Sequence, residues 1–535
     1  MLEWNLDSSI AINNLAIYAA TSTIATADPG ALLTTVAGTL RTLEVTLPAD
    51  TGMRHFRMVA LGATGLASTL SPELAVDTTP RLAFVAQNGC ASCLDLFAAP
   101  STALANTINL SALPVGRALT EFQLAPDARS GAFTADRDTA GKRELFAVDL
   151  GTSIAAQKLS GLIAGTGVIS GTRFSPDARH LAYVADAATS GVFEVYVVPR
   201  DGSSAPVKVS GATVAGGGAA LANGTADVAW SPDGENLAWL ADQRQDGVVE
   251  LFVAAADGSS APVALAGALQ ATTEVATFAW SPTSASIAYA ADRNADGIYE
   301  LFLAAADGST QPTVRSGPQL DADVLRFAWS PDGQKVAFVS TRRSPTLLEV
   351  YVADAAGSAD PVPLDSTLPA FSGSTRFAWS PDATKVAFVC DRQIDGQFEL
   401  YVAAAVGTTA GTNVSGTMVL RGDVGEFAWS PDSTRIAFRA DRVVDDRFEL
   451  YVATLATGGE PTTVSGTMPA TGDVLDFAFS ADGTQLTFRA DAQTDQLFEQ
   501  WVAPANGTLS PTLVPGGGSG VATAPAAAFA TIGRR

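Results

Sequence analysis

The sequence has few of the side chains that most often carry acid–base catalysis or bind metals. Its 535 residues include only two histidines, His55 and His180, and three cysteines. A metalloprotease helix of the H-E-x-x-H type is therefore absent, and a histidine-based triad is disfavoured. No G-x-S-x-G motif, phosphate-binding loop or dinucleotide fingerprint occurs. The familiar catalytic motifs thus provide no candidate nucleophile.

Positive charge and long apolar runs are also scarce. The chain has 32 Lys and Arg residues against 55 Asp and Glu residues, which gives a formal net charge of −23. A surface this negative repels nucleic-acid phosphates and anionic lipids. Apolar runs fall short of the roughly 18 to 20 residues that span a bilayer, and no export-signal pattern follows Met1. We therefore expect neither nucleic-acid binding nor membrane insertion.

A repeat of about 50 residues dominates the sequence and indicates the fold class. Each copy carries an aromatic residue followed by Ser-Pro-Asp or a close variant, and the copies are spaced by 49 to 56 residues. The copies begin at Phe174, Trp230, Trp280, Trp329, Trp379, Trp429 and Phe479, with a weaker copy at Leu124. The longest step contains a Gly/Ala-rich insert at Gly211–Ala226.

One copy shows the strands expected in each unit. The first strand ends at Trp429, Ser-Pro-Asp forms a turn, and Ile436 and Phe438 alternate along a second strand. Phe448–Val452 is a third strand and Pro461–Ser465 a fourth. Four strands per unit without helical periodicity predict an all-β protein, a β-propeller of four-stranded blades.

The two ends of the repeat array predict how the ring closes. Arg81–Ala86 and Leu94–Ala98 match second and third strands, but no first strand precedes them. Ala526–Thr531 lies where a further first strand is due. We expect this C-terminal strand to complete the blade begun at residue 80 and so remove exposed sheet edges. Eight complete units and one composite unit give nine blades, with eight blades as the alternative.

The motif W-S-P-D-(G)-x-x-(I/V)-A-F followed by E-L-(Y/F)-V resembles the TolB-like propeller repeats, a WD-like group. The resemblance covers residues 80–535. It implies a propeller fold but no particular function, because propellers bind, scaffold and catalyse.

Residues 1–79 lack the repeat and form a separate predicted module. Their strand-like segments are Leu2–Trp4, Leu15–Tyr18, Leu43–Leu47, His55–Ala60 and Glu73–Val76. They resemble a fibronectin type III module that starts at its second strand, with Arg54 in place of the corner tyrosine. A chain cut from a longer polypeptide would explain the missing strand and export signal. The alternative is an unrelated small β-cap.

The loop between second and third strands repeats a pattern of carboxylates. Its clearest copy places Asp292, Asn294, Asp296 and Glu300 around Gly297, and oxygen ligands on a tight turn suit Ca²⁺. It resembles the calcium hairpins of integrin-type propellers. Partial copies are Asp242, Asp246 and Glu250; Asp391, Asp395 and Glu399; Asp441, Asp445 and Glu449; and Asp491, Asp495 and Glu499.

Two other readings of these loop acids stay open. The ninth position is acidic even in blades that lack the other acids, which favours structural pairing, for example of Glu399 with Arg392 or with backbone N–H groups. The second alternative is that these loops bind a cationic partner.

Further acids precede a valine at the entry to first strands: Asp227, Glu274, Asp323, Asp423 and Asp473. They predict an acidic face that is either a solvated surface or a docking site for a basic protein or a metal. The recurring tryptophans are expected to pack between blades rather than stack on sugars.

The cysteines bear on the compartment. Cys90 and Cys93 lie in the loop of the composite blade, where a local disulfide would indicate an oxidising environment, with free thiols as the alternative. Zinc lacks ligands there, because Cys390 lies on a core strand.

These observations lead to a functional hypothesis. We expect a non-catalytic exported propeller, outside the cell, on its surface or in the periplasm, that acts as a scaffold for a protein partner or for its own copies. Ca²⁺ is the one candidate cofactor. The alternative is a carbohydrate-active lyase or glycosidase with paired carboxylates, for which Glu426 and Asp476 on inner strands are the first candidates.

Overall fold

The computed structural model describes residues 108–513 apart from short gaps at 118, 128, 151–154, 162–166, 220, 223–224, 268, 270–272, 295–296, 318–322, 345–346, 358, 365–372, 408–409, 457, 481 and 495–496. In the first 107 residues it describes only the strands whose bounds follow. Two compact units are present. The first comprises the described residues up to Thr120 together with Arg129–Phe133 and part of Val148–Ala156, and the second comprises the rest.

The first unit contains three antiparallel sheets. Strands β1 (Leu2–Glu3) and β4 (Thr42–Leu43) form a pair. A four-stranded sheet has the order β3 (Leu32–Ala37), β2 (Asn14–Ala20), β5 (Met53–Leu61), β6 (Leu74–Asp77). A three-stranded sheet has the order β7 (Arg81–Gln87), β8 (Leu94–Pro100), β9 (Ile108–Asn109). Strands β7 and β8 match the second and third strands predicted for the incomplete blade, and β9 adds a strand in the fourth position.

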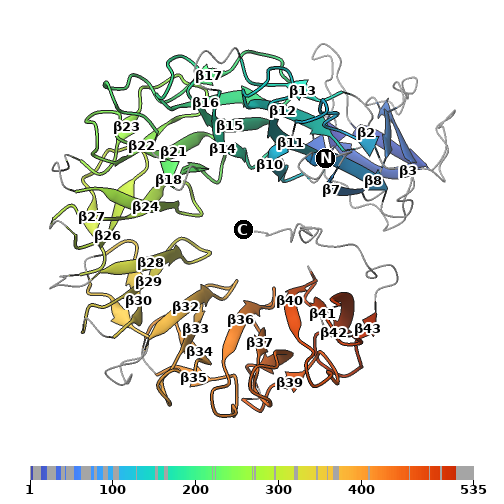
Figure 1. Ribbon diagram of the computed structural model, residues 1–535, viewed down its shortest axis with the longest axis vertical. Coiled ribbons are helices and arrows are strands. Elements are labelled where there is room, and N and C mark those ends of the chain that lie inside the picture. Colours follow the sequence, from blue (N-terminus) through green and yellow to red (C-terminus); the bar gives the residue numbers. More distant parts are fainter. Residues whose placement is uncertain are drawn as a thin grey trace. The chain divides into compact units, whose positions relative to one another are not determined.

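Eight sheets of four consecutive antiparallel strands follow along the described chain (Figure 1), and we name each as a blade by its first strand. Their bounds are β10 Leu119–Leu124, β11 Ser130–Ala135, β12 Glu144–Asp149 and β13 Gln157–Lys158; β14 Ile169–Phe174, β15 His180–Ala185, β16 Glu194–Pro199 and β17 Val207–Lys208; β20 Val228–Trp230, β21 Asn236–Ala241, β22 Glu250–Ala255 and β23 Val263–Ala264; β24 Val275–Trp280, β25 Ser286–Ala291, β26 Glu300–Ala305 and β27 Thr313–Val314; β28 Val324–Trp329, β29 Lys335–Ser340, β30 Glu349–Asp354 and β31 Val362–Pro363; β32 Ser374–Trp379, β33 Lys385–Cys390, β34 Glu399–Ala404 and β35 Thr412–Asn413; β36 Val424–Trp429, β37 Arg435–Ala440, β38 Glu449–Thr454 and β39 Thr462–Thr463; β40 Val474–Phe479, β41 Gln485–Ala490, β42 Glu499–Pro504 and β43 Thr512–Leu513.

The Ser-Pro-Asp motif closes the turn between the first two strands of a blade. In the β36 blade, the Ser430 hydroxyl donates to Asp432 Oδ1 at 2.5 Å and accepts the Arg435 backbone N–H at 3.0 Å. Asp432 Oδ1 also accepts the Thr434 N–H at 3.0 Å, and Ser433 adopts a left-handed φ of 60°. Short polar side chains are therefore required here, because they satisfy the backbone of the turn.

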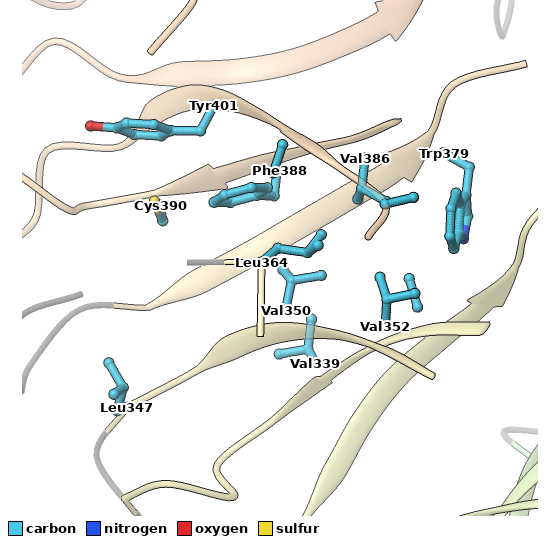
Figure 2. Packing of buried hydrophobic residues seen from close by; sticks show 13 residues of the cluster. Val339, Leu347, Val350, Val352, Leu364, Trp379, Val386, Phe388, Cys390 and Tyr401 are labelled. Atoms are coloured by element: carbon cyan, nitrogen blue, oxygen red, sulfur yellow. The ribbon is translucent and has the colours of Figure 1, made fainter. Parts of the chain in front are cut away.

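The core lies between neighbouring blades as well as within them. Figure 2 shows one cluster, in which Val350 and Leu364 from the β28 blade pack with Phe388 and Cys390 from the β32 blade. Trp379 contributes to the same cluster, and its indole N–H donates to the Ala328 carbonyl of the preceding blade at 3.1 Å. The inter-blade bond recurs in other blades, from Trp230 to Arg173, Trp280 to Ala229, Trp329 to Ala279 and Trp429 to Ala378.

The sequence prediction of repeated four-stranded, all-β units is confirmed. Within the Gly/Ala-rich insert, β18 (Leu221–Ala222) and β19 (Thr225–Ala226) form a short hairpin. The predicted closing strand at Ala526–Thr531 lies outside the described residues, so the closure of the ring stays a prediction. In the part of the chain that the structure describes, no helix is long and apolar enough to cross a membrane.

Candidate functional site

The first aspartate of each acidic loop holds the loop against the entry to the first strand. Asp391 accepts the Gly396 N–H at 3.1 Å and the Gly373 N–H at 2.6 Å. Asp242 makes the same two kinds of bond, to Gly247 at 2.9 Å and Gly218 at 2.7 Å. Equivalent bonds join Asp292 to Gly297 and Glu274, and Asp441 to Asp446 and Asp423. These carboxylates therefore have a structural role whether or not a metal binds.

The ninth acid of the loop is buried and pairs within its own blade. Glu399 accepts the Tyr401 hydroxyl at 2.6 Å and the Asn413 amide at 3.0 Å. Glu449 accepts the Tyr451 hydroxyl at 2.6 Å and lies 3.3 Å from Arg447.

Glu250 and Glu300 use partners from the loop itself. Arg244 Nε donates to Glu250 at 2.8 Å, and the Asn294 amide donates to Glu300. Burial raises the pKa of Glu300, and the bond from Asn294 opposes that rise. Asn294 thus binds a neighbouring carboxylate in the loop that was predicted as the clearest calcium copy. The remaining predicted ligand of this loop, Asp296, lies outside the described residues.

One loop brings three carboxylates together. Ligating oxygens of Asp441, Asp445 and Asp446 all lie within 4.8 Å of one another. Asp446 was missed in the sequence because it occupies the position of Gly297 and Gly396 in other loops, and its φ of 63° is the left-handed backbone that this glycine position requires. The exposed Asp246 and Asp395 occupy the fifth position of their loops without such a third acid. The calcium assignment stays a prediction, now centred on the Asp441 loop.

Three of the entry acids connect consecutive blades. Asp423 accepts the Phe398 N–H of the preceding blade at 2.7 Å, and Asp473 accepts the Phe448 N–H at 2.8 Å. Asp323 accepts the Tyr299 N–H at 3.0 Å. Burial raises the pKa of Asp423, while the bond from Phe398 opposes that rise. These half-buried acids contribute to blade packing.

Glu274 and Asp227 differ from those three acids. Glu274 is exposed and accepts the Tyr299 hydroxyl at 2.8 Å; burial and Glu274 raise the pKa of that tyrosine to about 12. Asp227 lies three residues further along its strand than the other entry acids, because Val228 pairs with Trp239 as Phe278 pairs with Tyr289. Asp227 is therefore equivalent to Thr277, and burial raises its pKa.

A hollow of about 450 Å³ lies along the first strands of the β28, β32, β36 and β40 blades, and we call it the inner-strand hollow. Its charged lining residues are Arg326, Arg376 and Glu426, and its aromatic ones are Phe327, Phe377, Phe427 and Phe477. Glu426 was singled out from the sequence as an acid on an inner strand, whereas the arginines at the equivalent positions of β28 and β32 were missed because only acids were considered there. Asp476 occupies on β40 the position that Glu426 has on β36, but it forms an ion pair with Arg489.

The predicted disulfide residues, Cys90 and Cys93, lie outside the described residues. Cys390 is not in a disulfide and has no exposed surface.

The repeated four-stranded sheets and their inter-blade contacts define a β-propeller protein. Residues 125–487, more than half of the chain, match the family described as the dipeptidyl peptidase IV (DPP IV) N-terminal region, and the chain belongs to this family.

Solved structures agree with the fold. A eukaryotic initiation factor is similar with a TM-score of 0.50 and 12% identity, over 82% of this chain and 96% of that one. Dipeptidyl peptidase 4 of Porphyromonas gingivalis is similar with a TM-score of 0.50 and 12% identity, over 76% of this chain. The match spans 63% of the length of that peptidase. No curated protein matches this chain.

The family corrects the functional hypothesis drawn from the sequence. The prediction of a non-catalytic scaffold was wrong, because the matching family is a region of a peptidase and points to a peptidase-like enzyme. The carbohydrate-active alternative is not supported by it. The error has a physical origin: the absence of a nucleophile motif in this sequence was taken as the absence of an enzyme, whereas a propeller can serve chemistry carried elsewhere.

Proposed function

We propose that this chain is the propeller part of a peptidase-like enzyme of the dipeptidyl peptidase IV type, and that it binds the peptides on which the enzyme acts. The observation that carries the proposal is the family match over residues 125–487. The sequence itself holds no G-x-S-x-G motif and two histidines, so we assign hydrolysis to a catalytic part outside it.

The inner-strand hollow supports a role in peptide binding. It combines arginine and glutamate side chains with four phenylalanines, and peptides present both charged termini and apolar side chains. Its volume of about 450 Å³ lies within the usual range of roughly 300 to 1,000 Å³ for ligand pockets.

The proposal includes the finer architecture. Nine blades with a composite one are supported by the three-stranded β7–β9 sheet, which has the strands of a blade except the first. Completion by Ala526–Thr531, the eight-bladed alternative, the domain boundary at residue 80 and the fibronectin type III assignment of residues 1–79 stay predictions. Export from the cytoplasm, association with a protein partner and calcium binding stay predictions as well.

Peptidase activity is tested on the full-length protein as its own cells make it. The protein is tagged at the chromosomal locus, purified, and incubated with dipeptide nitroanilides and with a fluorophosphonate probe for reactive serines. We expect release of nitroaniline and covalent labelling of the purified enzyme. If a preparation shown by mass spectrometry to contain this chain intact released no nitroaniline and was not labelled, the proposed function would be overturned.

A further inference from the structure

We propose that the inner-strand hollow is a carboxylate-recognition site, in which Arg326 and Arg376 bind the free C-terminal carboxylate of a short peptide. Carboxylate recognition rests on the geometry of the hollow, whereas the choice of a peptide as the ligand rests on the proposed function.

A β-bulge presents the two arginines to the hollow. The pairing register of the first strand shifts between Val324 and Arg326, and again between Ser374 and Arg376. Bulges redirect side chains and often occur beside binding sites. Beyond the bulge, Arg326 pairs with Val339 and Arg376 with Val389, so the two arginines occupy equivalent positions in consecutive blades. Both side chains are exposed and both line the hollow.

The charge changes sign at the same position in the following blade. Glu426 pairs with Arg439 in the register that Arg376 has with Val389, and Glu426 also lines the hollow. The hollow is therefore positive along β28 and β32 and negative along β36. A ligand with an anionic group and a cationic or hydrogen-bond-donating group is complementary to this arrangement.

Arg376 is positioned by a bond to the next blade. Its Nη1 donates to the Gly425 carbonyl on β36, beside Glu426. A guanidinium has five N–H donors in a rigid plane, so one bond to the backbone orients the group and leaves donors for a ligand. Arginine pairs with carboxylates through two parallel hydrogen bonds, which a lysine does not provide.

The phenylalanines account for the rest of the ligand. Phe327, Phe377 and Phe427 are half-buried, each directly after the charged residue of its strand. Half-exposed rings gain free energy when apolar groups cover them. A short peptide offers a terminal carboxylate for the arginines and aliphatic or aromatic side chains for these rings, whereas a small inorganic anion would leave the rings uncovered.

The test measures binding to the purified chain by isothermal titration calorimetry. The probe is an N-acetylated tetra-alanine peptide with a free C-terminal carboxylate, and its C-terminal amide is the uncharged comparison. We expect the amide to bind at least tenfold more weakly. Arg326→Gln and Arg376→Gln should each weaken binding of the free acid at least fivefold. Arg179→Gln is the matched control, because Arg179 is an exposed arginine on a turn of the β14 blade, and it should bind as the unaltered chain does.

Three results would overturn the carboxylate site: equal affinity for acid and amide, equal loss in the Arg179→Gln control, or no binding of the acid. Binding of an oligouronate without binding of the peptide acid would overturn the peptide assignment. Thermal unfolding of each variant establishes that it is folded. Peptidase activity in the full-length enzyme together with no peptide binding here would refute this site alone, whereas binding without any peptidase activity would refute the proposed function alone.

Discussion

The carboxylate of Asp423 accepts the backbone N–H of Phe398 from the preceding blade at 2.7 Å, so a side chain at the entry to one blade satisfies the backbone of another. The backbone N–H of Asp423 in turn donates to Asp441 within its own blade. Asp473 and Asp491 repeat this chain of bonds in the next blade, where Asp473 accepts from Phe448. A polar link of this kind fixes the spacing of blades where apolar packing alone would allow sliding.

Replacing Asp423 tests the inter-blade link. Asp423→Ala leaves the Phe398 N–H without its acceptor, and the expected loss in unfolding free energy is about 1 to 3 kcal/mol. Asp423→Asn keeps an acceptor oxygen without a half-buried charge, so it should lose clearly less. Urea denaturation followed by circular dichroism measures both. If Asp423→Asn lost as much unfolding free energy as Asp423→Ala, the charge of Asp423 rather than its hydrogen bond would be what matters.

The recurring tryptophan provides a second test of blade packing. Trp379→Phe keeps an aromatic ring but leaves the Ala328 carbonyl without the indole donor, and we expect a loss of about 1 to 3 kcal/mol. Trp379→Ala also creates a cavity and should cost about 3 to 5 kcal/mol. Trp501→Phe is a suitable control, because the Trp501 indole bonds at 3.4 Å within its own blade. Equal losses in Trp379→Phe and Trp501→Phe would contradict a special inter-blade role.

The periodic part of the structure was predictable from the sequence, because architectural residues recur. Trp429 ends β36 as predicted, and the predicted third strand at Phe448–Val452 overlaps β38 (Glu449–Thr454). The site was less predictable. Arg326 and Arg376 occupy equivalent positions of consecutive repeats, but the residue spacing does not show that they line one hollow with Glu426, because that depends on how the neighbouring first strands lie. Asp227 was placed with the entry acids from its neighbouring valine, whereas strand pairing places it three positions further on.

The Ser-Pro-Asp turn should make stability depend on acid. The hydroxyls of Ser430 and Thr434 and the Thr434 N–H outweigh burial and lower the pKa of Asp432 from its ordinary value of 3.8 to about 2. A lowered pKa stabilises the fold above the ordinary value, and this contribution is lost as the pH falls from 3.8 toward about 2.

Ser430→Ala is the variant that tests this turn. It removes the hydrogen bond from the Ser430 hydroxyl to Asp432 and should cost about 1 to 3 kcal/mol at pH 7, with a smaller difference from the unaltered chain near pH 2. Thr434→Ala, which keeps the backbone donor, should cost less at pH 7. Unfolding midpoints measured across this pH range decide the matter, and a pH-independent difference would show that Asp432 is not involved.

Thiol chemistry tests the cysteine predictions. Cys390 is fully buried, so it should not react with a thiol reagent in the native state and should react in denaturant. The chain has three cysteines, and a Cys90–Cys93 disulfide would leave one reactive thiol in denaturant without reductant. Mass spectrometry of the alkylated chain counts them. Three alkylated thiols in protein purified from an oxidising compartment would show that the disulfide prediction is wrong.

Calcium is expected first at the loop where Asp441, Asp445 and Asp446 come within 4.8 Å of one another, because hard cations prefer several oxygen ligands on one turn. Ca²⁺ at 100 times its dissociation constant would stabilise the fold by about 2.7 kcal/mol and raise the melting temperature relative to EDTA-treated protein. Asp445→Asn should abolish that increase. Asp395→Asn is the matched control, because Asp395 has the same loop position in the preceding blade, where Gly396 replaces the third acid. Identical melting curves with EDTA and Ca²⁺, together with no calcium in the purified protein by plasma mass spectrometry, would show that the calcium prediction is wrong and that these carboxylates serve the loop alone.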